Sequence, residues 1–226
     1  LIPQMYWNES YGFSPNMSTW VTNCAGRQLI IGLAPYKMID SNNWETTVVT
    51  DQIEKIRAKN GTSGVCFFRT DHVIDESEPK IAALYEALKD NYFKYPAHIV
   101  PMDYNGITQP NAPINVTHEY YNGEYTITWE TPELDIDETP IKYYSVYLSD
   151  GSSVDLDNPQ NVIGHIVKET TFSYPSTNPN LRFAVTTFDK NYYESSPAHS
   201  SIASVDDINT HDNIFATIDY LSCNIS

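Results

Sequence analysis

The pattern of apolar and polar positions changes character near the middle of the chain. In the first hundred residues, short unbroken apolar runs alternate with stretches in which apolar residues recur every three or four positions. After about residue 113, apolar residues recur at every second position instead. The first pattern is typical of parallel α/β folds, and a period of two is typical of half-buried antiparallel strands. The sequence therefore predicts an α/β region followed by an all-β region.

Three strands alternate with helices in the first region. The central strand is Gln28–Lys37, which opens with a continuous apolar run and in which Gly32 and Pro35 argue against a helix. The other two predicted strands are Leu1–Trp7 and Thr62–Thr70. Strands separated by helices imply parallel pairing with right-handed crossovers.

Helix signals follow each of these strands. Ser18 is the expected N-cap of the first helix and Gly26 its end, and the second helix is expected over Trp44–Asn60. The third helix begins at Pro79, which suits a first helical turn. Apolar residues then recur on one face, at Ile81, Leu84, Tyr85 and Leu88.

Each predicted strand of this region ends in an aromatic residue followed by a second large side chain. The pairs are Tyr6 with Trp7, Tyr36 with Lys37, and Phe68 with Arg69. The carboxyl ends of parallel strands are where ligands bind in such folds. Aromatic faces stack on sugar rings, and cations donate hydrogen bonds to hydroxyls or carboxylates. The pattern favours a sugar-binding rim, and the alternative is that these rings only cap the core.

These strand motifs resemble a known family. IPQMYW, IGLAPYK and GVCFFRT, followed by YPAHIVPM, are similar to the last three strands of the glycosyl-hydrolase-10-like family of bacterial proteins, over about residues 1–102. The resemblance implies that residues 1–104 are the end of a TIM-type (β/α)8 barrel that hydrolyses glycosidic bonds, with cell-wall-type glycans as a substrate class. It implies a sugar cleft lined by Gln4, Tyr6, Trp7, Tyr36 and Lys37. Arg69 stands where such barrels often carry a small hydroxyl residue, and it is added to the predicted contacts.

Two carboxylates follow the strand ends, and neither is assigned a catalytic role. Glycosidases use a carboxylate pair, roughly 5 to 9.5 Å apart. Glu9 lies in a polar turn typical of solvated loops, and Asp71 precedes His72, whose side chain would point to the opposite face of a strand. We expect the acid and base to lie on earlier strands of a longer protein, since this chain begins at Leu1, and the 226-residue fragment to be inactive alone.

The second region predicts an immunoglobulin-like sandwich over residues 113–200, after a proline-rich linker at 105–112. The clearest alternation is YTITWE, with Tyr125, Ile127 and Trp129 on one side. A later strand alternates in the same way, with Tyr144, Val146 and Leu148 opposite Tyr143, Ser145 and Tyr147. The tail at 201–226 suggests no function.

This region resembles the fibronectin type III family over roughly residues 112–198. By that resemblance Trp129 is the core tryptophan, Tyr144 its packing partner, and Leu181 the leucine before the sixth strand. Phe183 stands where the family has a tyrosine, so the hydroxyl hydrogen bond usual at that corner is expected to be absent. All of these roles are structural.

The amino-acid composition excludes several classes of binding partner. The formal net charge of −16 argues against nucleic acid and anionic membranes, and no run of about 20 apolar residues could span a bilayer. Cys24 and Cys66 are expected to be small buried residues, and Cys223 completes no metal-binding spacing. A calcium loop at Asp155, Asp157 and Asn158 lacks the glycine and closing glutamate of an EF-hand. No metal and no cofactor are expected.

The sequence thus predicts part of a bacterial glycoside hydrolase that acts on a polysaccharide and is secreted, periplasmic or on the outer cell surface. The alternative is a non-catalytic cell-surface module for carbohydrate binding or adhesion. Self-association that completes the open sheet is a third possibility, because unpaired strand edges tend to find partners.

Overall fold

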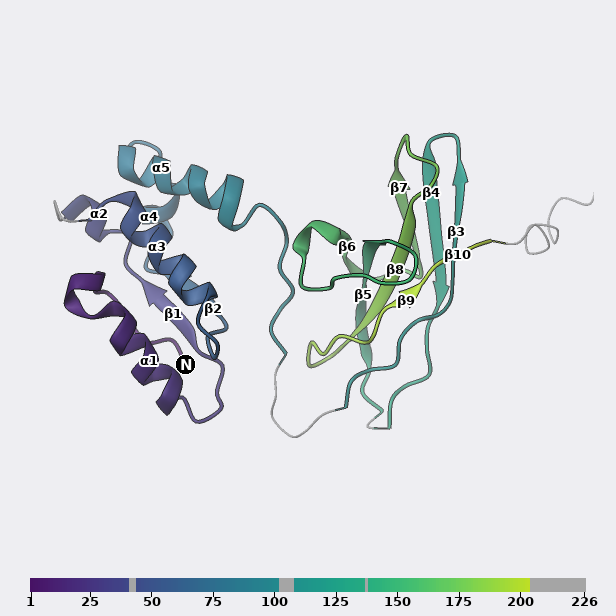
Figure 1. Cartoon of the computed structure of the whole chain (residues 1–226), viewed down its shortest axis with the longest axis horizontal. Helices are drawn as coiled ribbons and strands as arrows, with labels where there is room; N and C mark the ends of the chain where they lie inside the picture. The colour runs from purple at the N-terminus through teal and green to yellow at the C-terminus, as the bar shows by residue number, and fades with distance from the viewer. Residues whose placement is uncertain (41–43, 102–107, 137, 204–226) are drawn as a thin grey trace, which may run out of the picture. The chain divides into compact units, whose positions relative to one another are not determined.

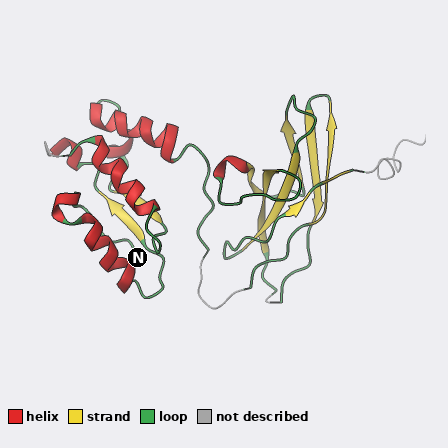
Figure 2. Cartoon of the chain, viewed as in Figure 1, coloured by secondary structure: helices red, strands yellow, loops and turns green. Residues whose placement is uncertain are grey.

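The computed structural model describes residues 1–40, 44–101, 108–136 and 138–203. The chain divides into two compact units, Leu1–Tyr95 and Pro96–Ser226. Helices and a small sheet build the first unit, and the second consists of strands joined by loops with one short helix (Figures 1 and 2). Residues 105–107 of the predicted linker and 204–226 of the tail lie outside the described residues.

The sheet of the first unit is parallel, as predicted. Strand β1 (Ile30–Leu33) pairs with β2 (Gly64–Phe67), with Ile31 opposite Val65. The N-terminal segment runs parallel to β1 on its other side, because Met5 N donates to Gly32 O and Gly32 N donates to Pro3 O, both at 2.9 Å. Strands β1 and β2 are shorter than the sequence predicts, and the predicted strand Leu1–Trp7 is reduced to an isolated bridge at Gln4.

Gly32 allows the N-terminal segment to approach this closely. A Cβ atom at residue 32 would lie 2.8 Å from Pro3 O, closer than real Cβ contacts come, and the obstacle is backbone that cannot swing aside. The glycine that argues against a helix in the sequence therefore also places the first segment in the sheet.

The helices of the first unit begin and end near, but not at, the predicted positions. They are η1 (Glu9–Tyr11), α1 (Phe13–Asn23), α2 (Lys37–Asp40), α3 (Thr46–Arg57), α4 (Asp71–Ile74), α5 (Pro79–Ala87) and η2 (Leu88–Tyr92). Pro79 opens α5 as predicted. The expected N-cap at Ser18 is wrong, because α1 already starts after Gly12, whose left-handed φ of 88° turns the chain into the helix.

Only one face of the small sheet carries the core of this unit. Met5, Ile31 and Leu33 are fully buried, together with Phe13 of α1 and Ile53 of α3. Residues in register on the opposite face include Gln4 and Cys66, and both are exposed. The predicted burial of Cys66 is therefore wrong, since alternation along β2 turns its side chain away from the helices; Cys24 is half-buried.

The second unit contains two four-stranded sheets, ordered β10-β3-β4-β7 and β6-β5-β8-β9. Pairing is antiparallel except between β10 and β3. The strands are β3 (Ile114–Tyr121), β4 (Glu124–Glu130), β5 (Ile141–Ser149), β6 (Val162–Val167), β7 (Thr171–Pro175), β8 (Arg182–Asp189), β9 (Ala198–His199) and β10 (Ser201–Ile202), with the short helix η3 (Pro159–Asn161) before β6. Ladder pairing thus continues past residue 200, where the sandwich was predicted to end.

The core of the second unit contains the predicted residues. Tyr125, Ile127 and Trp129 are buried along β4 while the residues between them are exposed. Trp129 meets Tyr144 of β5 edge to face, with ring centroids 5.4 Å apart.

The loop before β8 forms hydrogen bonds with a tyrosine hydroxyl, which the sequence does not predict. Phe183 is fully buried and carries no hydroxyl, but Tyr125 of β4 packs on it with ring centroids 4.8 Å apart. The Tyr125 hydroxyl donates to Asn178 O at 3.0 Å and accepts from Leu181 N at 2.9 Å. A tyrosine from β4, in the opposite sheet, therefore holds the corner where Phe183 lacks the hydroxyl.

Candidate functional site

The three strand ends of the first unit come together. Tyr6 lies 6.1 Å from Tyr36 and 6.2 Å from Phe68, and Tyr36 lies 6.2 Å from Phe68, measured between ring centroids. Tyr36 meets both other rings nearly edge to face, at 86° and 80°. Parallel pairing of three adjacent segments brings these rings together, because their carboxyl ends share one edge of the sheet.

A pocket with a volume of ≈ 460 Å³ opens beside these rings. Four predicted contacts line it: Tyr6, Trp7, Tyr36 and Lys37. Four further residues line it that the sequence does not indicate: Asn8, Tyr11, Asp40 and Trp44. Trp7 is 42% exposed and Tyr11 72% exposed, so two aromatic faces at this pocket are open to a ligand.

Lys37 is held in place by the pocket wall. Its ammonium donates to Tyr6 O at 2.8 Å and lies 5.6 Å from the centroid of the Trp44 ring. Lys37 is also the first residue of α2, because the predicted strand Gln28–Lys37 ends at Leu33 and turns into this helix. The side chain therefore links the first strand end to the second and keeps a positive charge in the pocket.

Gln4 and Arg69 lie away from this pocket's lining. Gln4 sits opposite Gly32 in the sheet, on its exposed face. Arg69 forms an ion pair with Asp71: its Nε donates to Oδ1 at 2.9 Å, and the second guanidinium contact is 2.8 Å. The structure thus brings four of the six predicted contacts together and commits the Arg69 guanidinium to a carboxylate two residues away.

Asp71 and His72 lie on a helix, not on a strand. Both belong to α4, and His72 Nδ1 is 3.1 Å from Asp71 Oδ1. The expectation that their side chains point to opposite faces is therefore wrong, because it assumed strand geometry. The His72 ring also lies 5.9 Å from the Tyr36 ring, at the border of the aromatic group.

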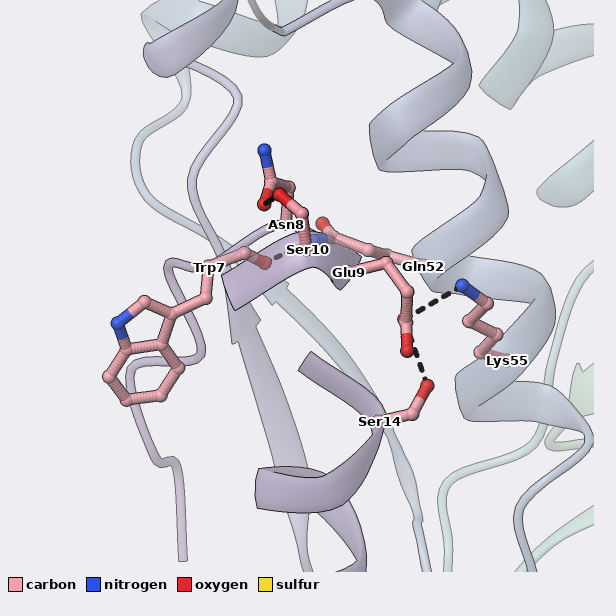
Figure 3. Close-up of polar contacts among 7 residues, drawn as sticks. All are labelled: Trp7, Asn8, Glu9, Ser10, Ser14, Gln52 and Lys55. Carbon is pink, nitrogen blue, oxygen red and sulfur yellow. Dashed lines mark hydrogen bonds and ion pairs between the residues drawn. The ribbon is translucent and has the colours of Figure 1, made fainter. Parts of the chain in front are cut away.

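Glu9 joins helices instead of facing the pocket. Its Oε2 accepts from Lys55 Nζ at 2.8 Å and from Ser14 Oγ at 2.9 Å, which ties η1 to α3 and α1. The hydrogen bond from Lys55 lowers the pKa of Glu9. Figure 3 shows the Trp7 indole directed away from this cluster, while Trp7 O accepts from Gln52 Nε2 at 2.7 Å. Because the hydrogen bond from Lys55 favours its ionised form, the Glu9 carboxylate is a poor proton donor.

The pocket offers one carboxylate in the described part of the chain. Asp40 lines it, one helical turn after Lys37, and Glu9 and Asp71 do not. Glycoside hydrolysis by the common mechanism needs two carboxylates flanking the bond. The described lining is therefore suited to holding a ligand, and it does not present the acid pair.

A second cluster of titratable groups lies on the outer face of β5. His98 Nε2 and the Tyr147 hydroxyl are 2.8 Å apart, and that hydroxyl donates to Glu194 Oε1, which also accepts from Thr186. The His98 ring lies 4.9 Å from the His165 ring. Burial and then His165 lower the pKa of His98 to about 4. Burial also raises the pKa of Tyr147 and of Glu194.

This cluster is a packed interior rather than a site. Tyr143, Ser145 and Tyr147 are buried although they point away from the sandwich core. Phe188 stacks on Tyr143 with ring centroids 4.7 Å apart and lies 4.6 Å from the His98 ring. The alternation along β5 therefore separates two buried faces, and the segment carrying His98 covers the second.

The described residues were also compared with the requirements of a metal site and of a membrane-spanning helix. Among the described residues, no group of three or more His, Cys, Asp or Glu side chains is arranged to hold a metal ion. Asp155 Oδ1 accepts from Asp157 N and Asn158 Oδ1 from Gln160 N, so both cap turns of their own loop. Within the described ranges, no helix has the length and apolarity that crossing a bilayer requires.

Comparison with known proteins gives general similarity. The sequence matches no family model, and no curated protein matches it. Solved structures with glycoside-hydrolase and fibronectin type III domains are similar to parts of the chain.

Three solved structures illustrate the similarity. A bacterial orthologue of human α-L-iduronidase is 22% identical over 43% of this chain and 16% of its own, with a TM-score of 0.32. A spore cortex lytic enzyme from Clostridium perfringens is 10% identical over 76% of this chain and 66% of its own, with a TM-score of 0.32. A titin module from human cardiac muscle is 20% identical over 43% and 90%, with a TM-score of 0.29. The chain thus spans about one sixth of the iduronidase orthologue, and these values assign no family.

Proposed function

We propose that the pocket beside the three strand ends binds a saccharide chain. The observation that carries this proposal is the convergence of Tyr6, Tyr36 and Phe68 next to a pocket that also holds Trp7 and Lys37. The exposed Trp7 and Tyr11 faces suit the apolar C–H face of a pyranose. Lys37 and Asn8 supply hydrogen-bond donors for hydroxyl groups at the rim.

The wider activity we propose is hydrolysis of glycosidic bonds by a longer bacterial protein to which this chain belongs. The resemblance of the strand motifs to the end of a (β/α)8 barrel supports it, as does a parallel sheet with helices packed on one face. In this proposal the acid pair comes from strands outside these 226 residues, and the second unit is a fibronectin-III-like accessory. A secreted, periplasmic or outer-surface location follows from a polysaccharide substrate and is part of the same proposal.

The competing proposal is a carbohydrate-binding or adhesion module without catalysis. The observation that favours it is the single described carboxylate, Asp40, at the pocket. The two proposals share the saccharide site and differ in whether a longer natural protein cleaves what it binds. Incubation of that protein with cell-wall glycan, followed by a reducing-end assay, separates them.

The binding site is tested with two tryptophan variants of the 226-residue chain. Trp7 and Trp20 are similarly exposed, at 42% and 39%, but Trp20 lies on α1 outside the pocket lining. We expect Trp7→Ala to weaken binding to oligosaccharides and insoluble cell-wall glycan by about two- to tenfold, since aromatic stacking contributes about 0.5–1.5 kcal/mol. Trp20→Ala should bind as the wild type does.

Tyr36→Ala extends this test to the second strand end. It removes a ring that contacts both Tyr6 and Phe68, and affinity should fall with it as well. Wild-type affinity in both Trp7→Ala and Tyr36→Ala, with folding verified by circular dichroism, would show that the site assignment is wrong.

A further inference from the structure

Lys37 differs from four cations of the first unit that form ion pairs with carboxylates. Lys55, Lys80 and Lys89 pair with Glu9, Glu45 and Glu86 at 2.8, 2.9 and 3.3 Å, and Arg69 pairs with Asp71 at 2.8 Å. The described contacts of the Lys37 ammonium are a carbonyl, Tyr6 O, and a ring, Trp44. Among the described residues, the cation in the pocket thus has no carboxylate within ion-pair distance.

The surroundings of Lys37 make its charge available to a ligand. The side chain is half-buried between Tyr6 and Trp44, and Trp44 itself is 5% exposed. One N–H of the ammonium is directed to Tyr6 O, which fixes the orientation of the group. Apolar rings around a fixed cation lower the local dielectric constant and strengthen its attraction for an anion.

We propose that the saccharide bound in this pocket carries a carboxylate, and that the Lys37 ammonium binds that carboxylate. This inference rests on the proposed saccharide site and specifies its ligand as an acidic glycan. The shared chemistry is a sugar-borne carboxylate, either the C6 carboxylate of a uronic acid or the lactyl carboxylate of N-acetylmuramic acid. A charge-assisted hydrogen bond such as that from ammonium to carboxylate is about twice as strong as a hydrogen bond between two neutral groups.

Asp40 determines which end of the pocket the ligand carboxylate occupies. It lines the same pocket one helical turn after Lys37, on the exposed side, and it forms no ion pair with Lys37. A ligand carboxylate is therefore attracted toward Lys37 and repelled from Asp40, which fixes which end of the pocket the acidic group occupies. Removing either charge should change affinity for acidic saccharides in opposite directions.

The test uses matched probes that differ only at the carboxyl group, which reduction converts to a neutral hydroxymethyl group. The first pair is a hyaluronan tetrasaccharide, which contains glucuronic acid, and its carboxyl-reduced form. The second pair is a peptide-free N-acetylglucosamine–N-acetylmuramic acid tetrasaccharide and its carboxyl-reduced form. Calorimetric titration of the 226-residue chain at moderate salt screens the long-range repulsion from its net charge of −16. At least one acidic form should bind about tenfold more tightly than its reduced partner.

Variants assign that preference to the pocket. Lys37→Gln keeps a donor for Tyr6 O and removes the charge, and the acidic-to-reduced affinity ratio should fall to about one. Lys37→Arg should keep the ratio above one, and Asp40→Asn should raise it. Lys89→Met, which removes a helix-surface lysine paired with Glu86, is the matched control and should leave the ratio unchanged.

The outcomes separate this inference from the proposal beneath it. Equal binding of acidic and reduced forms by the wild type overturns the carboxylate inference and leaves the saccharide site standing. A preference that survives in Lys37→Gln overturns the role of Lys37. Binding of none of the four probes overturns this inference, and the same absence with neutral cell-wall oligosaccharides overturns the proposed function as well.

Discussion

The two units bury their sheets in different ways. In the first unit, helices cover one face of a small parallel sheet and Cys66 on the other face is exposed. In the second unit, β5 is buried on both faces, with Tyr144 and Val146 in the sandwich core and Tyr143 and Tyr147 on the outer side.

This difference separates polar groups that are open to ligands from polar groups that hold the structure. Lys37 and Asp40 border a pocket and form no ion pair with each other. Tyr147 and Glu194 satisfy one another in a buried network. Burial lowers the pKa of His98 and raises that of Tyr147, so in this network the shifted pKa values follow from packing.

The largest expected effect tests whether the units are independent. Ile31→Ala in β1 and Trp129→Ala in β4 each remove a buried side chain and should cost about 2–5 and about 3–5 kcal/mol of unfolding free energy, respectively. Because the chain divides into two compact units, each variant should lose amide exchange protection in its own unit alone. Loss of protection in both units from either substitution would contradict this division.

A smaller effect should appear on acidification, at His98. Its folded pKa of about 4 lies below the ordinary 6.5, so the unfolded chain takes up a proton that the folded ring resists. The stability contributed by neutral His98 is therefore lost as the pH falls from about 6.5 to 4. The loss should be on the order of 2 kcal/mol, discounted because the ring is still partly exposed.

His98→Gln isolates this contribution. Thermal unfolding of the wild type and of His98→Gln at pH 7.5 and 4.5 should show the stability advantage of the wild type shrinking at the lower pH. His165, Tyr147 and Glu194 lie near the same ring and are present in both proteins, so the difference between the proteins reports His98. A constant difference across this range would show that His98 is not held neutral.

The smallest predicted effect concerns the corner before β8. Tyr125→Phe leaves Asn178 O and Leu181 N without their hydroxyl partner and should cost about 1 kcal/mol in denaturant unfolding. Tyr121→Phe, at a side chain that is 77% exposed, is the control and should change stability by less than about 0.5 kcal/mol. Equal effects of the two variants would remove Tyr125 from its role at this corner.

Local signals that no tertiary contact opposed were predicted from the sequence. Pro79 opens a helix, the alternation from Tyr125 to Trp129 survives intact in β4, and parallel strands bring Tyr6 and Tyr36 together. In each case the deciding interaction lies within one element or between adjacent strands.

Features set by distant packing were not predicted. Trp44 and Tyr11 reach the pocket because the start of α3 and the turn at η1 lie beside the strand ends, and periodicity carries no such information. The sequence predicts a start of α1 that is too late. Two signals for the true start were present: Gly12, whose positive φ turns the chain into the helix, and Pro15, which a first helical turn tolerates. The corner was expected to lack a hydroxyl because residue 183 is Phe, and Tyr125 supplies one from the opposite sheet, a contact that local sequence does not reveal.

The burial of strand β8 restricts which substitutions this sequence can accept during evolution. All seven positions from Phe183 to Asp189 are buried, whereas β4 exposes every second position. Neutral substitution is free at the outward positions of β4 and at none of these seven. In divergent relatives, we therefore expect the stretch FAVTTFD to change less than the alternating strand β4.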